Sequence, residues 1–186
     1  HNADQVDDPQ IKDRFEALKE KGVIRYAGLT THGDVKGCTA KAIEFGVYSL
    51  IMPTLKRSDY DLLNEEFKKA KEKKIGFMAM KTMGGLKSQE MQLAYLKKLL
   101  SEPSLVTVNK GIGTFDMFDA WLKAAQETLT SQDDFQLYKY AQANRKDFCM
   151  MCDECKKHCP EHVEISTIIR CKDYYYGQMG DWNTAT

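Results

Sequence analysis

Hydrophobic residues occur along this chain in four short runs that few polar residues interrupt. The runs lie near residues 23–30, 47–52, 75–81 and 105–109. Nearly continuous apolar stretches of this length are typical of strands that are buried on both faces. The segments between them are long enough to hold one crossover helix each. The pattern therefore predicts an α/β protein built from parallel βα repeats.

Segments with a helical spacing of apolar residues lie before, between and after these runs. In the first of them, Ile11, Phe15 and Leu18 recur at i, i+4 and i+7, and Pro9 suits the first helical position. The segments with this character are 8–21, 34–45, 59–73, 88–100 and 116–126. Four βα units form either a small open sheet or half of a TIM (β/α)8 barrel, which in full needs about 250 residues.

The character of the chain changes near residue 130. A polar helix is expected over 131–145, followed by a group of cysteines, a short helix over 163–171 and an aromatic tail. We therefore expect two parts. Residues 1–130 would form the half barrel, and residues 131–186 a small α-helical module.

Charge and hydropathy exclude two classes of protein. Lys and Arg together number 27, as do Asp and Glu, so the formal net charge is zero. This balance argues against a nucleic-acid-binding protein that relies on neutralising phosphates. A membrane-spanning helix needs about 20 apolar residues, and the sequence has no such run. The sequence shows no signal peptide. Because it begins with His1 and not with Met, we expect a processed product or a fragment of a longer protein.

Four of the six cysteines lie close together, at Cys149, Cys152, Cys155 and Cys159, and Pro160 follows them. A secreted disulfide scaffold would spread its cysteines through the whole chain. The spacing C-x2-C-x2-C-x3-C-P is instead that of bacterial ferredoxins, whose thiolates hold an iron–sulfur cluster. The run predicts a [4Fe-4S] cluster in a ferredoxin-like module. Structural zinc is the alternative, although its cysteines usually come in two separated pairs.

The identity of the fourth cluster ligand stays open at the level of the sequence. In ferredoxins with two clusters, the fourth cysteine of such a run binds the other cluster. This chain has no second run, so the fourth thiolate would come from Cys159, from Cys171 or from Cys38. We favour Cys159, because Cys171 is more simply explained as a small buried apolar residue.

Several segments, in this order, resemble the aldo-keto reductase family. The segment Lys21–His32 resembles the K-G-x-I-R-x-x-G-x-S-x-H motif around the fifth barrel strand of that family. Ile75–Gly85 resembles the seventh strand, and Val106–Leu122 the eighth strand with its helix. His1-Asn2 is similar to the end of the fourth strand, and the cysteine run with Tyr176–Trp182 is similar to the tail of the iron–sulfur branch. The chain thus resembles the second half of such a barrel.

The resemblance implies NADP-dependent carbonyl reduction. A hydride would pass from the nicotinamide, and a tyrosine supported by Lys, Asp and His would donate the proton. His1 matches the catalytic histidine. The other three residues would lie upstream of it, so we expect the isolated chain to lack the catalytic acid.

The resemblance also implies positions for the cofactor. Thr30 and Thr31 match the pair that holds the nicotinamide carboxamide. Gly111, Gly113 and Thr114 match the phosphate-binding loop at the start of a helix. Threonines that end a strand and glycines in a turn are also common without any ligand.

Three features depart from the family pattern. Met52 stands where the family usually has Gln, and the Arg that reads the 2′-phosphate of NADP is missing. Asp116 and Asp119 lie in its region instead, and their charges would repel a 2′-phosphate.

Three hypotheses for function follow. The chain is part of an aldo-keto-reductase-like oxidoreductase with a [4Fe-4S] cluster, or a non-enzymatic electron-transfer or scaffold module, or a zinc-stabilised interaction domain. We expect the half barrel to pair with its missing N-terminal half or with a second copy, and a redox partner protein is a further candidate. The compartment is predicted to be the cytoplasm, with export as the alternative. His32, at a strand end, is either a site residue or a solvated loop residue.

Overall fold

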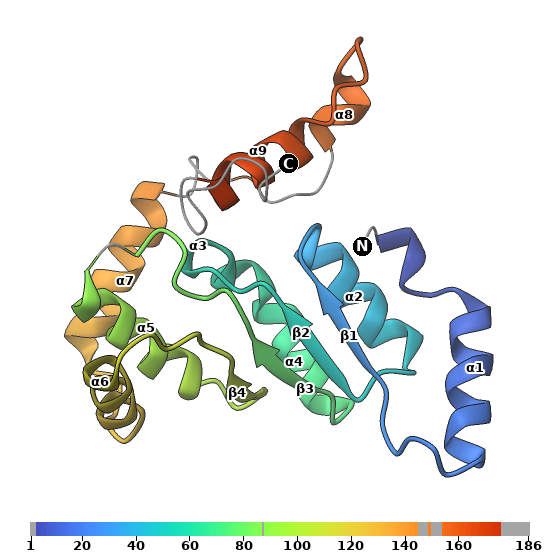
Figure 1. The fold of residues 1–186 in the computed structure, drawn as a ribbon, viewed down its shortest axis with the longest axis horizontal. Helices are drawn as coiled ribbons and strands as arrows, with labels where there is room; N and C mark the ends of the chain where they lie inside the picture. The colour runs from blue at the N-terminus through green and yellow to red at the C-terminus, as the bar shows by residue number, and fades with distance from the viewer. Residues whose placement is uncertain (1–2, 87, 145–148, 150–153, 176–186) are drawn as a thin grey trace.

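The computed structural model describes residues 3–86, 88–144, 149 and 154–175. A four-stranded sheet forms its centre, made of β1 (Gly28–Thr31), β2 (Leu50–Pro53), β3 (Gly76–Ala79) and β4 (Leu105–Val108). The strands lie side by side in sequence order, and every pair is parallel. The expectation of an α/β protein with parallel βα repeats is therefore confirmed (Figure 1).

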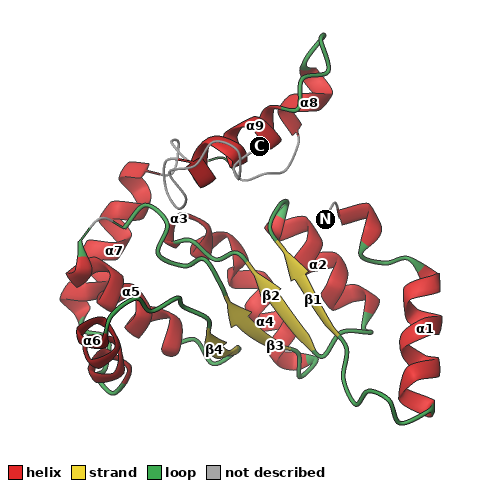
Figure 2. Cartoon of the chain, in the orientation of Figure 1, coloured by secondary structure: helices red, strands yellow, loops and turns green. Residues whose placement is uncertain are grey.

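Helices connect and flank these strands. Helix α1 (Pro9–Glu20) precedes β1, α2 (Val35–Phe45) joins β1 to β2, and α6 (Phe115–Ala125) follows β4. In Figure 2 the strands lie in front of α2 and α4. The remaining described elements are the 3-10 helices η1 (Ala3–Gln5) and η2 (Asp61–Leu63), and α3 (Arg57–Tyr60), α4 (Asn64–Glu72), α5 (Gln89–Leu100), α7 (Ser131–Asn144), α8 (Glu154–His158) and α9 (Ile165–Tyr174). Within the described ranges, no helix is both long and apolar enough to cross a membrane.

Local sequence signals set the helix starts. Asp8 caps α1 by accepting a hydrogen bond from the Gln10 amide, and Pro9 is the first helical residue, as expected. Ser88 caps α5 and Thr114 caps α6 in the same way. These caps satisfy amide groups that have no partner inside the helix.

The prediction for the first strand is wrong over its first half. β1 begins at Gly28 rather than near residue 23, and the side chains of Val23 and Tyr26 are 66% and 73% exposed. β1 is an edge strand, and its pairing with β2 starts at Gly28 and Leu50. The Ala27 carbonyl still accepts a hydrogen bond from the Ser49 amide, but within the described residues no strand pairs with the residues from Val23 to Tyr26. Burial on both faces also fails at the other edge, where Val106 of β4 is 63% exposed.

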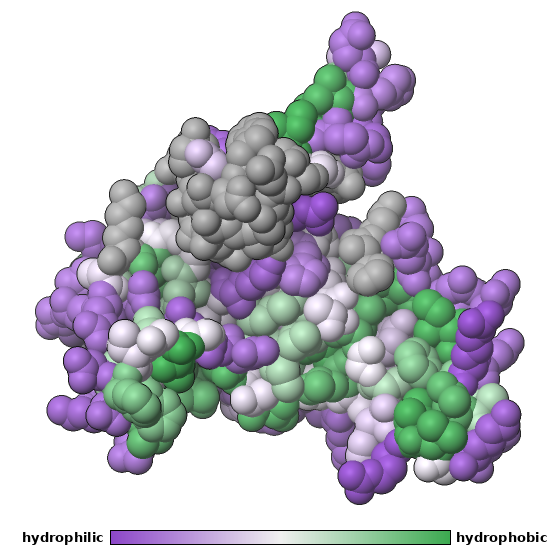
Figure 3. All heavy atoms as spheres, viewed as in Figure 1, coloured by the Kyte–Doolittle hydropathy of each residue, from purple (hydrophilic) through white to green (hydrophobic). Residues whose placement is uncertain are grey.

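The two faces of the sheet have different surroundings. Alternate residues such as Ile51 and Phe77 are fully buried, on the face that packs against the helices. On the other face, a Cβ atom at Gly76 would lie 3.0 Å from Val106 Cγ1 and 3.5 Å from Leu50 Cδ1. The side chains of Leu50 and Val106 thus both lie close above Gly76, and that of Val106 is 63% exposed. Figure 3 shows hydrophobic residues over the strands on the face turned to the viewer.

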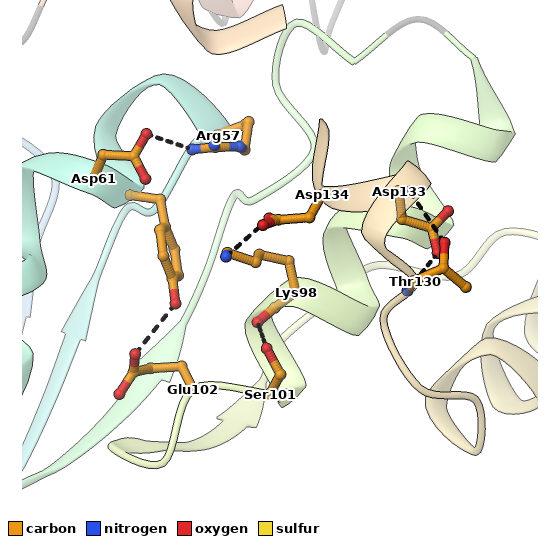
Figure 4. Close-up of polar contacts among 9 residues, drawn as sticks. Arg57, Asp61, Lys98, Ser101, Glu102, Thr130, Asp133 and Asp134 are labelled. Atoms are coloured by element: carbon orange, nitrogen blue, oxygen red, sulfur yellow. Dashed lines mark hydrogen bonds and ion pairs between the residues drawn. The ribbon is translucent and has the colours of Figure 1, made fainter. Parts of the chain in front are cut away.

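Helix α7 packs against α5 through two ion pairs. Lys97 Nζ lies 2.8 Å from Asp133 Oδ2. Lys98 Nζ lies 2.9 Å from Asp134 Oδ1 (Figure 4). The start of α7 is fixed by a reciprocal pair of hydrogen bonds. The Thr130 amide donates to the Asp133 carboxylate, and the Asp133 amide donates to the Thr130 hydroxyl, each at 3.1 Å. The polar helix after residue 130 is therefore anchored to the βα layer.

Candidate functional site

The carboxyl ends of the strands are the first place to examine, because sites in parallel α/β sheets form there. Thr31 pairs with Pro53 at this end, and Thr54 forms one further bridge with Met80. The residues that come next along the chain are thus brought together from three adjacent strands. They are His32, Thr54 and Lys81.

Thr30 and Thr31, expected to hold a carboxamide, lie in different surroundings. Thr31 is fully buried, and its hydroxyl donates a 2.9 Å hydrogen bond to the Gly33 carbonyl. Thr30 is half-buried and pairs with Met52 of β2. Its neighbour is therefore a thioether and not the amide that the family usually has there. Of the two threonines, Thr31 is the one whose hydroxyl forms a hydrogen bond within the described part of the chain.

Gly111, Gly113 and Thr114 lie in an exposed loop between β4 and α6. A Cβ atom at either glycine would have open space around it, so packing does not require a glycine at these positions. The Thr114 hydroxyl accepts a hydrogen bond from the Met117 amide at 3.2 Å. One of the amides that a phosphate would use is therefore already bonded.

The two groups of expected cofactor residues lie at opposite edges of the sheet. Thr30 is on β1 and the loop with Gly111 follows β4, with β2 and β3 between them. At about 4.8 Å per strand, the separation is about 14 Å. A single ligand that touches both groups would have to be extended and cross the ends of β2 and β3.

Three polar residues, His32, Thr54 and Lys81, follow β1, β2 and β3 along that path. His32 Nδ1 lies 3.5 Å from Thr54 Oγ1. Burial lowers the pKa of His32, and the positive charges of Lys81 and Arg170 lower it further. Sequence reasoning singled out His32 but missed Thr54 and Lys81. Their place directly after a predicted strand was the signal that could have found them.

The C-terminal helices lie over this end of the sheet. In Figure 1 the arrowheads of β1 and β3 point to the side of the molecule where α8 and α9 lie. The effect of Arg170, in α9, on His32 agrees with that placement. The cysteine-bearing module and the strand ends thus share one side of the molecule.

The cysteines of the expected cluster are described in part. Cys149 and Cys159 are half-buried and Cys155, in α8, is exposed, whereas Cys152 lies outside the described residues. The described cysteines form no disulfide with one another. Among the residues that the structure describes, no three His, Cys, Asp or Glu side chains gather closely enough to hold a metal ion. His1, the expected catalytic histidine, also lies outside the described residues.

The two alternative fourth ligands differ in position. Cys38 is fully buried in α2, where burial raises the pKa of its thiol and opposes the thiolate that a metal requires. Cys171 is half-buried in α9, which packs against α8. Cys171 is therefore compatible with a ligand role beside Cys159, and Cys38 is poorly suited to it.

Basic residues surround the cysteine run. Lys156, Lys157 and His158 form the last turn of α8, and Lys156 forms an ion pair with Glu164 just before α9. The Cys159 amide donates to the Lys156 carbonyl, and the His162 amide donates to the Cys159 carbonyl. Four thiolates give a cluster a net negative charge, which neighbouring cations stabilise. The residues present therefore fit an anionic metal cluster.

No family model matches the sequence, and a search of the curated proteins finds no match.

Proposed function

We propose that this chain is the C-terminal part of an aldo-keto-reductase-like oxidoreductase that carries a [4Fe-4S] cluster. The observation that carries the proposal is the cysteine run Cys149–Cys159 with its following proline, on a module that lies over the carboxyl end of a parallel sheet. This spacing is characteristic of iron–sulfur proteins. The end of the sheet below it is where α/β enzymes place their substrates.

The thiolates of Cys149, Cys152, Cys155 and Cys159 would hold the cluster, which when bound supplies one-electron transfer. Lys156 and Lys157, in the last turn of α8, would offset the negative charge of the cluster. The exposure of Cys155 would leave the cluster close to the surface, within reach of a redox partner protein.

The finer fold proposal is the second half of a TIM barrel with a ferredoxin-like module. Two features of the described residues support the half barrel: β1 and β4 are the outer strands of the sheet, and the side chains over Gly76 come from the neighbouring strands β2 and β4. In a closed barrel the face of the sheet above Gly76 lines the interior, and β1 and β4 pair with the other half. The N-terminal half implied by the resemblance, or a second copy, would complete it.

The cluster is tested by anaerobic preparation of the chain with iron and sulfide supplied. We expect about four iron atoms per chain and the broad visible absorption of a cubane. Cys155→Ser should lose most of the iron, and Cys38→Ser, which changes a thiol buried in the core, should keep it. Stoichiometric zinc with no iron would contradict the iron–sulfur cluster and favour the zinc-stabilised interaction domain.

The same preparation assigns the fourth ligand. Cys159→Ser and Cys171→Ser are compared for iron content and absorption. Loss of iron in Cys159→Ser alone identifies Cys159 as the fourth ligand. Loss of iron in Cys171→Ser alone identifies Cys171.

A non-enzymatic electron-transfer module is the second candidate, and one observation favours it. The expected phosphate loop has Asp116 in the first turn of the following helix, and its Thr114 hydroxyl already caps that helix. Lys110 lies over the Trp121 ring, 5.5 Å from its centroid, so Trp121 fluorescence should report on this loop. The reductase and the electron-transfer module are distinguished by titrating the Trp182→Phe variant, whose remaining tryptophan is Trp121, with NADPH. Saturable quenching of the Trp121 fluorescence supports the reductase, and unchanged fluorescence supports the electron-transfer module.

A further inference from the structure

Two methionine side chains lie side by side in the middle of the sheet. Ile51 of β2 pairs with Phe77 of β3, and the bridge just beyond the two strands continues the same register. The residues that come next along the two strands, Met52 and Met78, are therefore opposite each other. Paired strands are about 4.8 Å apart, so the two thioether groups are direct neighbours.

Both methionines lie on the face of the sheet that also carries Leu50, which we call the open face. Ile51 and Phe77 are fully buried against the helices, and successive side chains of a strand point to opposite faces. Met52 and Met78 consequently point away from the helices, and each is partly exposed. Solvent therefore reaches both side chains.

Two other methionines in the same part of the chain differ in their access to solvent. Met80, directly after β3, is 8% exposed, and Met83, in the loop that follows, is 9% exposed. A thioether reacts with a peroxide only where the oxidant reaches the sulfur atom. The fold thus leaves Met52 and Met78 open to oxidation and protects Met80 and Met83.

The surroundings of the pair suit the oxidised form. Thr30 of β1 pairs with Met52 and is half-buried on the open face, because its neighbour Thr31 is fully buried on the other face. A sulfoxide oxygen accepts hydrogen bonds, and the Thr30 hydroxyl is a donor at the adjacent position. Oxidation of Met52 would therefore place a polar group beside a hydroxyl that can bond to it, without disturbing the buried face.

We propose that Met52 and Met78 form a paired site of reversible oxidation by peroxides. In each reaction the sulfur atom takes one oxygen atom from the peroxide, so that an S–O bond forms and the O–O bond breaks. Sulfur loses two electrons, and the peroxide keeps its proton and is reduced to an alcohol or to water. Methionine sulfoxide reductases reverse the reaction, with a dithiol as the electron donor and water as the second product. The oxidised pair makes the centre of an apolar face polar. This inference goes beyond the proposed function and does not depend on the cluster.

The test compares the rate of oxidation at each methionine in the folded and the unfolded chain. The full chain is treated with tert-butyl hydroperoxide, with a chelator present to bind any released iron, and sulfoxide is measured at each site by mass spectrometry. The same treatment in urea gives the rates without protection by the fold. We expect folding to slow Met80 and Met83 at least about tenfold more than Met52 and Met78, because the buried pair reacts only after local opening. Equal protection of the four methionines would overturn the proposal.

Reversal is measured on the oxidised chain while it is still folded. Methionine sulfoxide reductases of both stereospecificities are added with dithiothreitol, and we expect the added oxygen to be lost from Met52 and Met78. Sulfoxide that persists at both positions in the folded chain, but is reduced once the chain is unfolded, would overturn the reversible role of the site.

A pair of double variants tests the change in polarity. Met52→Leu, Met78→Leu keeps the open face apolar and similar in volume but removes the two sulfur atoms. After peroxide treatment the unmodified chain should elute earlier from a phenyl column, and this variant should show a clearly smaller shift. The matched control, Met80→Leu, Met83→Leu, removes two buried methionines and should shift like the unmodified chain. Equal shifts in all three proteins would overturn the proposal.

Discussion

The covered and open faces of the same four-stranded sheet contain similar residues in different surroundings. Phe77 and Ile51 on the covered face are fully buried beneath helices, whereas Leu50 and Val106 on the open face both lie close above Gly76, and Val106 is 63% exposed. Both faces are apolar, so composition alone does not distinguish them. The difference shows that the covered face already has its partners within the chain. The open face has the character of a surface that another body would cover.

The covered face should carry the largest share of stability. Phe77 is 0% exposed, and its ring meets that of Phe67 edge to face, with centroids 5.0 Å apart. Phe77→Ala removes this contact and leaves a cavity, so we expect a loss of about 3–5 kcal/mol in the free energy of unfolding. Urea denaturation followed by circular dichroism measures it. A decrease in the free energy of unfolding of less than about 1 kcal/mol would mean that the side chains around Phe77 are packed less tightly than in the structure.

The open face should instead govern association. The double variant Met78→Lys, Val106→Lys adds two charges to this face, and a charge buried in an interface without a partner is strongly unfavourable. If the chain self-associates through this face, the dissociation constant of the dimer should rise by at least about tenfold, roughly 1.4 kcal/mol. Sedimentation equilibrium measures it.

The matched control for association places two lysines on an exposed helix. Gln136→Lys and Gln142→Lys lie on α7, and both positions are exposed. This variant should associate like the unmodified chain. Equal weakening in both double variants would assign the effect to net charge and not to the open face.

The same contrast explains which parts of the fold the sequence could predict. β2 and β3 have neighbours on both sides, and each forms within or close to its predicted run, although β2 begins at Leu50 rather than near residue 47. The run before Gly28 has the same character, but within the described residues no strand pairs with Val23 to Tyr26. A local pattern does not contain the position of a neighbour, and for this reason the edge was mispredicted.

The candidate site was predictable only where local spacing carries the chemistry. The cysteine run is read directly from its spacing. The grouping of His32, Thr54 and Lys81 depends on the register between three strands, which no short segment encodes. The position of the C-terminal module depends on the packing of α7 against α5, through ion pairs between residues far apart in sequence.

Those ion pairs give a smaller, pH-dependent prediction. Burial alone would raise the pKa of Asp133, but hydrogen bonds from Lys97 and Thr130 outweigh it and lower the pKa. The hydrogen bond to Asp133 raises the pKa of Lys97. The Asp133 contribution to stability is therefore complete above the ordinary carboxyl pKa and is lost as the pH falls through the lowered one. The Lys97 contribution is complete below the ordinary ammonium pKa and is lost as the pH rises through the raised one.

A double-mutant cycle with Lys97→Met and Asp133→Asn measures this pair. We expect a coupling of about 1 kcal/mol at neutral pH, at the upper end for ion pairs because both side chains are largely shielded from water. The coupling should disappear in acid. The exposed pair Lys68–Glu65 is the comparison and should show no measurable coupling. Equal coupling energies in the two pairs would show that shielding from water does not strengthen the Lys97–Asp133 ion pair.

The smallest expected effect on stability concerns the most exposed aromatic residue described. Phe115, at the start of α6, is 90% exposed, so Phe115→Ser removes almost no buried surface. The free energy of unfolding should change by less than about 0.5 kcal/mol, the usual range for such surface positions. Phe118 and Leu122 continue an exposed apolar stripe on the same helix. If the stripe belongs to the same association surface as the open face, Phe115→Ser should weaken self-association while the urea midpoint stays fixed. A clear shift of that midpoint would mean that Phe115 is buried within the folded monomer. The surface of α6 would then belong to the covered part of the molecule and not to its open surface.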